Sequence, residues 1–212
     1  MQLPKAIAIS TLISTMVLAI GAGVMMGSGR ADLIALPTEP ARATAFNIDK
    51  NRSTVIYKVR DLGVSNYYGR IKAPTGTFTI DRDNPENSSV IVNIDMKQMD
   101  SGDKNRDRLL LGPQYFNARQ YPVATFESTS ITKVTDTTFE AVGTFTMRGV
   151  TKEITVMLVD YAELQTTKFG YRGGFETTFT INRLDYGLTE HADGAMLGLD
   201  VQITVSVQGL KQ

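Results

Sequence analysis

The chain has 212 residues, carries 22 lysines and arginines against 22 aspartates and glutamates, and contains no cysteine. This balanced charge argues against nucleic-acid binding, which normally needs a basic excess or a basic stripe. The absence of cysteine excludes disulfides, thiolate catalysis and cysteine-ligated metal sites. We therefore expect one domain of about 165 residues, which is long enough for a sizeable core without covalent cross-links.

The N-terminal segment predicts export. Lys5 precedes an apolar run from Ala6 to Met26, which is the pattern of a secretory signal and is about long enough to span a bilayer. Residues 1–31 are therefore either a cleaved signal peptide or an uncleaved membrane anchor, and residues 32–45 are expected to form a linker. Both alternatives place the rest of the chain outside the cytoplasm, because the positive end stays inside.

Residues 46–212 alternate apolar and polar side chains in segment after segment, which indicates strands with one buried face. Turn residues separate the segments and no long helical pattern occurs, so we expect an all-β sandwich or barrel of antiparallel strands. We favour an eight-stranded antiparallel barrel, because a barrel of that size can hold one small ligand. The alternation is clearest over residues 55–59, 78–80, 90–96, 126–134, 139–147, 154–158, 175–181 and 201–207.

One stretch, Asp100 to Ser128, does not fit this pattern. Asn105 to Leu111 predicts a short helix that is capped by Ser101 or Asp103 and stopped by Gly112-Pro113. The aromatic residues that follow predict an apolar plug that returns the chain to the sheet. A helix and plug inserted between strands suggest a cap over one end of the barrel. The plug residues are Tyr115, Phe116 and Tyr121-Pro122.

The sequence offers few residues for catalysis or metal binding. Its one histidine, His191, is expected to be solvated in a loop. Asp100, Asp103 and Asp107 could bind a hard cation, but they lack the spacing of a calcium loop and alternate with basic residues. We interpret them as ion pairs and helix caps. We accordingly predict no catalytic residue, no metal site and no cofactor.

Four blocks of the sequence carry a family resemblance: Leu62–Ser65, Asp100–Ser128, Gly143–Lys152 and Ile181–Gly187. Spread in this order over about Phe46 to Lys211, they resemble the YceI family of bacterial polyisoprenoid-binding proteins. The resemblance implies a lipocalin-like barrel that holds a long isoprenoid tail, in the periplasm or at the periplasmic face of the inner membrane. The family usually has histidine where this chain has Asp61, and often has it at the positions of Leu109 and Arg148, so no role of those histidines carries over.

The candidate ligand site is the inner face of the barrel together with its mouth. Ligand pockets are concave and mostly apolar with a few polar groups, so the apolar phase of the strands and the plug aromatics are expected to line the lumen. Arginine suits a pyrophosphate head group at the mouth, and a quinone-like head is the alternative. The candidate residues are Tyr57, Val92, Ile94, Tyr115, Phe116, Ala141, Phe145, Phe179, Ile203 and Val205, with Arg106 and Arg183 at the mouth.

The predicted function is noncatalytic storage or transport of a polyisoprenoid or another long-chain amphiphile. Two alternatives stay open at this point. The chain could be an enzyme or accessory that acts on an isoprenoid quinone, or a structural envelope protein whose barrel is filled by its own side chains. Membrane association through residues 6–26 and a homodimer are both compatible with the sequence.

Overall fold

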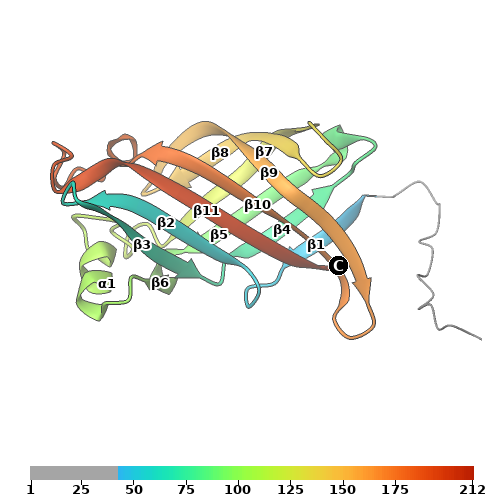
Figure 1. Ribbon diagram of the computed structural model, residues 1–212, viewed down its shortest axis with the longest axis horizontal. Helices are drawn as coiled ribbons and strands as arrows, with labels where there is room; N and C mark the ends of the chain where they lie inside the picture. Colours follow the sequence, from blue (N-terminus) through green and yellow to red (C-terminus); the bar gives the residue numbers. More distant parts are fainter. Residues whose placement is uncertain (1–42) are drawn as a thin grey trace, which may run out of the picture. The chain divides into compact units, whose positions relative to one another are not determined.

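The computed structural model describes residues 43–212, so the expectations for the signal or anchor and for most of the linker lie outside the described residues. The described part is an all-β barrel with one short α-helix (Figure 1). Within residues 43–212, no helix is both long enough and apolar enough to span a bilayer. The helix, α1, is Lys104–Leu111. The strands are β1 Thr44–Ile48, β2 Thr54–Asp61, β3 Ser65–Lys72, β4 Thr75–Ile80, β5 Ser89–Asp95, β6 Met99–Asp100, β7 Val123–Lys133, β8 Phe139–Met147, β9 Val150–Thr166, β10 Gly170–Asn182 and β11 Leu197–Lys211.

The predicted eight-stranded antiparallel barrel is confirmed. Strands β1, β4, β5, β7, β8, β9, β10 and β11 follow one another around the wall, and pairing of β1 with β11 closes the ring. β1 and β2 lie end to end along β11, because β1 pairs with residues 209–211 and β2 with residues 197–206. β3 continues the wall beside β2, and β6 pairs with β3. At the end of the barrel where β11 begins, the wall is therefore continued by β2, β3 and β6.

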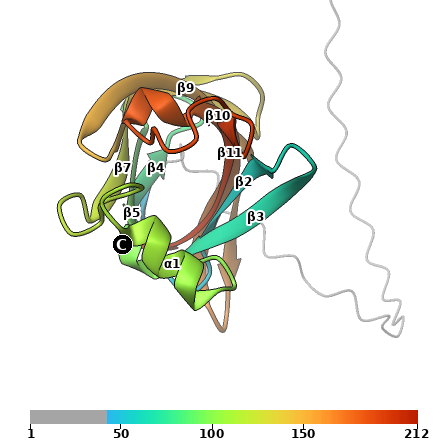
Figure 2. The same cartoon turned by 90° about the vertical axis from the view of Figure 1, so that its left-hand side faces the viewer.

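Helix α1 lies across one end of the barrel (Figure 2). Asp103 caps it, since its carboxylate accepts hydrogen bonds from the backbone N–H groups of Asn105 at 2.8 Å and Arg106 at 2.9 Å. The helix ends before Gly112, so the predicted helix over residues 105–111 is correct to within one residue. The plug that follows is held by Arg148, whose guanidinium donates to the carbonyl oxygens of Pro113 at 3.1 Å and Gly187 at 2.5 Å.

β1 begins and β11 ends at the opposite end of the barrel (Figure 1). Aromatic side chains pack the interior there. The rings of Phe46 and Phe78 stack with centroids 4.9 Å apart, and Phe175 meets Phe78 edge-on at 5.2 Å. Gly209 makes room for this stack, because a Cβ there would lie 2.7 Å from atoms of both Phe46 and Phe78. We call this the filled half of the barrel, and the half beneath α1 the mouth half.

Candidate functional site

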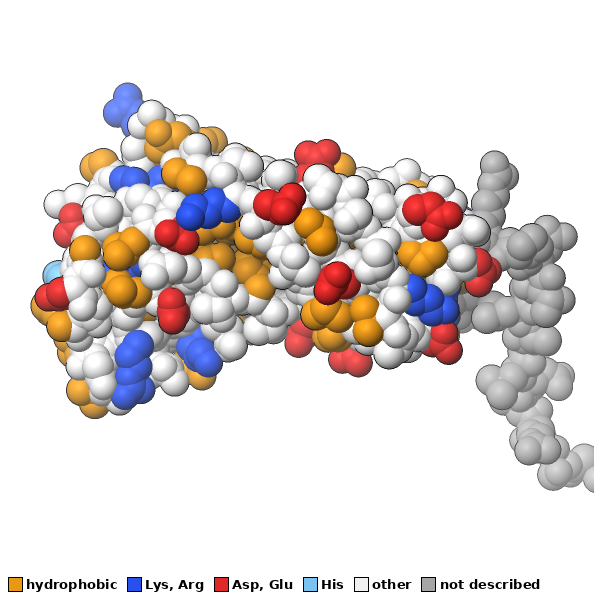
Figure 3. All heavy atoms as spheres, turned by 90° about the horizontal axis from the view of Figure 1, so that it is seen from above, with side chains coloured by type: hydrophobic (Ala, Val, Ile, Leu, Met, Phe, Trp, Pro, Cys, Tyr) orange, Lys and Arg blue, Asp and Glu red, His pale blue; other side chains and the backbone are white. Residues whose placement is uncertain are grey.

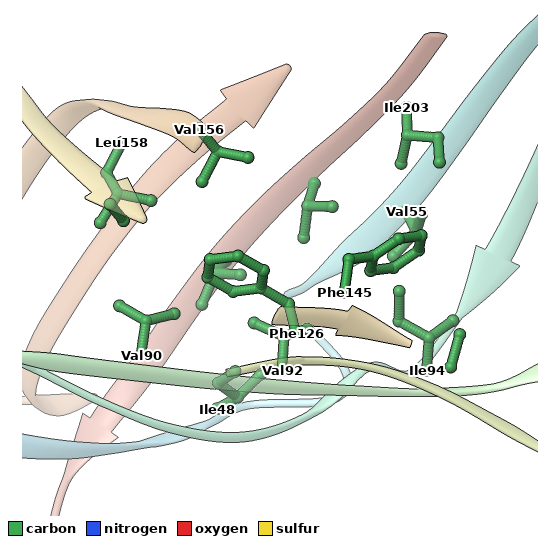
Figure 4. Close-up of a cluster of buried hydrophobic side chains, with 14 of the residues drawn as sticks. Ile48, Val55, Val90, Val92, Ile94, Phe126, Phe145, Val156, Leu158 and Ile203 are labelled. Atoms are coloured by element: carbon green, nitrogen blue, oxygen red, sulfur yellow. The ribbon is translucent and has the colours of Figure 1, made fainter. Parts of the chain in front are cut away.

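The mouth half encloses a cavity of about 100 Å³, the inner cavity, between the barrel wall and the α1–plug segment. Strand alternation aims the apolar side chains of β2, β5, β8 and β11 into the same space, and side chains from opposite walls face one another there (Figure 4). The plug supplies its roof. The lining residues are Val55, Tyr57, Val59, Ile71, Ile94, Met96, Leu110, Tyr115, Phe116, Ala124, Phe145, Met147, Ile181, Arg183, Leu188, Leu197, Val201 and Ile203.

An outer cleft of about 260 Å³ leads to this cavity. Five residues line both spaces, so the cleft and the inner cavity adjoin: Tyr57, Val59, Leu110, Tyr115 and Leu197. The remaining wall of the cleft contains Asp61, Tyr67, Arg106 and His191 together with the apolar Leu62, Leu109 and Met196. The site therefore changes from polar and apolar side chains at its entrance to an almost wholly apolar interior.

Tyr57 stands at the junction of cleft and cavity. Its ring lies against Gly69 of the neighbouring strand, where a Cβ would come within 2.1 Å of the ring. Its hydroxyl is buried and has no hydrogen-bond partner in the described part of the chain. Burial raises the pKa of this hydroxyl, so the group stays protonated and can donate one hydrogen bond. An oxygen atom of a ligand at this level could accept it.

Arg106 lies over the ring of Tyr67, with its guanidinium carbon 4.4 Å from the ring centroid. The Tyr67 hydroxyl donates to the carbonyl oxygen of Ser101, which fixes the ring beneath the guanidinium. Interaction with Tyr67 raises the pKa of Arg106, so the side chain is a permanent cation on the wall of the outer cleft. This position suits contact with the polar head of a ligand.

Arg183 is buried, and backbone carbonyl oxygens take up its guanidinium. Its Nε donates to Gly198 at 2.9 Å, and its Nη2 donates to His191 at 2.7 Å and Leu197 at 2.8 Å. A further N–H donates to Leu188. Four of the five guanidinium N–H groups are thus occupied. Arg183 holds the loop between Tyr186 and β11 in place at the mouth and has little capacity left for a head group.

A second, smaller cavity of about 20 Å³ lies deeper, and Ile94 and Phe145 line both it and the inner cavity. Phe145 contacts the rings of Phe179 at 5.7 Å and Tyr186 at 5.5 Å, both edge-on. This aromatic cluster narrows the lumen between the two cavities. Beyond it the barrel is packed.

The structure brings most of the predicted site residues together, and their contact with a ligand stays a prediction. The seven residues predicted from strand alternation all line the lumen: Tyr57, Ile94, Phe145 and Ile203 the inner cavity, and Val92, Phe179 and Val205 the smaller one. Tyr115 and Phe116 line the inner cavity and Arg106 lines the cleft. Ala141 is fully buried but lines neither cavity, because it packs between Ile131 and Val156 on the flanking strands.

Sequence reasoning missed several lining residues. Leu188 lies in the connection before β11, where no alternation marks an inward direction, whereas Met96 continues the alternation of β5 past the end of that strand and was not included among the candidates. Ala124 faces the cavity from β7 opposite Ile94, but a small alanine does not stand out in the apolar–polar alternation of a strand. Gly69 matters because Tyr57 occupies the space that its missing side chain leaves, which only the strand register reveals.

The acidic cluster has the structural role predicted for it. Besides the cap made by Asp103, Asp107 accepts a hydrogen bond from the Ser101 backbone at 2.8 Å, and hydrogen bonding from Ser101 lowers its pKa. Asp100 pairs with Lys72 at 2.7 Å and Arg70 at 3.4 Å, and the hydrogen bond from Lys72 is the main cause that lowers the pKa of Asp100 to about 2. These carboxylates fasten α1 and β6 to β3.

Comparison with known proteins gives consistent results. Residues 46–209 match the sequence profile of the YceI-like domain. Protein YceI of Salmonella arizonae is 32% identical over 190 residues, covering 89% of this chain and 97% of that protein. BcnA of Burkholderia cenocepacia superposes with a TM-score of 0.67 at 23% identity, over 76% of this chain and 98% of BcnA. A polyisoprenoid-binding domain from Saccharophagus degradans, implicated in plant cell wall breakdown, superposes with a TM-score of 0.61 at 14% identity, over 81% of this chain and 100% of that domain. At these identities the two structural likenesses show the fold alone.

Proposed function

The chain belongs to the YceI family, and from this premise we propose that it binds a long-chain polyisoprenoid, or a similar amphiphilic lipid, inside its barrel without catalysing a reaction on it. The observation that carries the proposal is the apolar inner cavity, which adjoins a cleft with polar groups in the mouth half of the barrel. The Saccharophagus domain, which shares the fold, is a polyisoprenoid-binding domain, and this supports the same ligand class.

Burial of the tail supplies the binding energy in this proposal. Each CH₂ group transferred from water to an apolar site contributes about 0.8 kcal/mol. A tail needs a long apolar surface and no charged partner, and the walls of the inner cavity offer such a surface. A tail longer than the inner cavity would displace the half-buried Leu110, Tyr115 and Phe116, which pack on the core from the α1–plug segment. The α1–plug segment is then the part of the site that adapts to chain length.

The polar head group would lie at the level of Tyr57 and Arg106. The buried Tyr57 hydroxyl could donate to an oxygen of the head, which would remove the cost of an unpaired buried hydroxyl. Arg106 would contact the head from the cleft wall, while its stacking on Tyr67 keeps it in place. Arg183 lines the inner cavity but would act on the ligand mainly through the loop that it holds, because backbone carbonyl oxygens occupy four of its N–H groups.

Two measurements test the proposal. Native mass spectrometry of protein purified without detergent should detect a co-purified lipid, whose mass identifies it. Ala124→Phe, which places a ring in the inner cavity, should lower retention of a fluorescent polyprenyl compound at least about tenfold. The matched control is Ala162→Phe, since Ala162 is exposed on β9 and should retain the compound like the parent. Equal retention by Ala124→Phe and the parent would place the ligand outside the inner cavity.

We also propose that the barrel is exported to the bacterial cell envelope, because Lys5 and the apolar run Ala6–Met26 form an export pattern. Cell fractionation with N-terminal sequencing tests this. A cytoplasmic protein that keeps Met1 would contradict it. A membrane-bound protein that keeps Met1 would identify an anchor, and a shortened protein in the periplasm would identify a cleaved signal.

A further inference from the structure

Exposed apolar side chains surround the outer cleft. Leu62 and Val64 in the β2–β3 turn expose 58% and 78% of their surface, Leu109 on α1 exposes 50%, and Met196 in the loop before β11 exposes 51%. Leu62, Leu109 and Met196 also line the cleft. Hydrophobic side chains are visible on this end of the molecule, on the left in Figure 3. We call these four residues the mouth rim.

The backbone conformation of the β2–β3 turn exposes the side chains of Leu62 and Val64. Leu62 and Gly63 both have positive φ, at 52° and 64°, as the central residues of a turn that the Val64 N–H closes by donating to the Asp61 carbonyl oxygen at 3.0 Å; Asn-Gly or Gly-Gly is usual at two such positions. A leucine in this region is unfavourable, so its presence at an exposed turn needs a reason beyond folding. The Leu62 N–H donates to the Met196 carbonyl oxygen at 2.8 Å, which ties two segments of the rim together.

Three arginines near the mouth rim form no ion pair within the described part of the chain. Arg60 donates to the Gly63 carbonyl oxygen at 2.8 Å, Arg106 stacks on Tyr67, and Arg108 donates to the Asn105 side chain. Each is free to contact a phosphate, for which a guanidinium is well suited. Acidic residues also lie at this end, on α1 and β6 as well as beside the cleft, so the attraction is local rather than a long-range field.

We propose that the mouth rim docks on a phospholipid bilayer, with its apolar side chains inserted and the three arginines against lipid phosphates. This inference rests on the proposed function, because docking in this orientation lets the tail pass from bilayer to cavity without crossing water. A bilayer fits better than a protein partner, since the apolar residues sit on three separate segments around an opening. A stable protein interface would need roughly 800 Å² of continuous surface on each side, and here the centre of the rim is the opening itself.

The rim can be tested without a ligand, because the chain has no cysteine and a single introduced one can be labelled. Val64→Cys, labelled with a fluorophore that shifts to the blue in an apolar medium, should shift when vesicles of phosphatidylethanolamine and phosphatidylglycerol (3:1) are added. The matched control is Val134→Cys, because Val134 is 55% exposed in the β7–β8 turn of the filled half. A shift at both positions, or at neither, would overturn the proposal.

A second arm follows transfer of a fluorescent polyprenyl compound from the protein to the same vesicles. If the rim docks, the transfer rate should rise in proportion to vesicle concentration, and Val64→Asp should lower it about tenfold while Val134→Asp leaves it unchanged. Val64 lines neither the cleft nor the inner cavity, so retention of the compound in the absence of vesicles should stay at the parent value for both variants. A rate independent of vesicle concentration would mean release through water and would contradict docking. Failure of the parent to retain the compound would contradict the proposed function instead, and the fluorophore arm would still decide on docking.

Discussion

The two halves of the barrel are built from the same strands but differ in how side chains fill the interior. In the filled half, Phe46, Phe78 and Phe139 are completely buried and their rings pack against neighbouring rings. In the mouth half, strands of the same alternation leave the inner cavity open, and the α1–plug segment covers it. The packed rings and the inner cavity thus lie at different ends of the same strands. Four matched pairs of conditions or substitutions test this division.

Removing a large ring should separate the halves most clearly. Phe78→Ala in the filled half leaves a void among packed rings and should cost about 3–5 kcal/mol of unfolding free energy. Phe116→Ala in the mouth half should cost clearly less, because its half-buried ring already borders empty space. Chemical denaturation of both variants measures the difference. Equal costs would mean that the inner cavity is closed in solution.

Adding a ring should give the second largest effect. Ala141→Phe overpacks a tightly filled site, and such changes cost about 1–3 kcal/mol. Ala124→Phe should cost less, because its ring can enter the inner cavity. Thermal denaturation without ligand compares the two. A larger loss for Ala124→Phe than for Ala141→Phe would contradict an open mouth half.

Removing a buried hydroxyl should lower the unfolding free energy when the hydroxyl is in the filled half, but not when it is in the mouth half. In the filled half, the Tyr161 hydroxyl donates to the Glu163 carboxylate, so Tyr161→Phe removes a hydrogen bond to a charged group and should cost about 1.5–3 kcal/mol. The Tyr57 hydroxyl has no partner, so Tyr57→Phe should leave the ligand-free protein as stable as the parent or about 1 kcal/mol more stable. Denaturant titration of ligand-free protein decides this, and destabilisation by Tyr57→Phe would reveal a partner for that hydroxyl.

Acid should loosen the mouth half locally. The pKa of Asp100 is lowered to about 2, mainly by the hydrogen bond from Lys72, so the contribution of this pair is complete above the unfolded value of about 4 and is lost as pH falls toward 2. Because Asp100 is on the surface, the effect should be small. It should appear as a loss of amide-exchange protection in β6 and α1 over that pH range. Asp100→Asn should reduce this pH dependence, and the part that remains should come from Asp103 and Asp107, whose pKa values are also lowered. Asp136→Asn, which removes an exposed pair with Lys133 in the β7–β8 turn, should leave it unchanged.

Much of the fold could be predicted because its signals are local. Alternation along a strand fixes which side chains face inward, and the register of antiparallel neighbours preserves it, so Val92, Ile94 and Ile203 point into the lumen as predicted. The helix boundaries followed from a capping aspartate and a Gly-Pro stop. The division of the lumen could not be predicted in the same way. It depends on which rings meet across the barrel, and on glycines such as Gly69 and Gly209 that make room for rings on other strands.

The environments of the polar residues in the candidate site could not be predicted from local sequence patterns either. In the sequence, Arg106 and Arg183 are both cations beside a turn. In the structure, Arg106 stacks on the ring of Tyr67, whereas Arg183 is surrounded by backbone carbonyl oxygens. The difference arises because the chain between Tyr186 and β11 folds back over Arg183. No pattern within either segment indicates that return. Long-range contacts of this kind decide which predicted residues remain available to a ligand.

The direction of β1 decides which end of the barrel is accessible when the protein is held at a surface. β1 begins with Thr44 at the filled half and pairs there with the last residues of β11, so the C-terminal end of β11 lies opposite the mouth rim (Figure 1). A barrel immobilised through a tag after β11 would therefore present its outer cleft, and not its packed aromatic rings, to added vesicles. Exchange of a lipid with such an immobilised barrel can be followed without releasing the protein.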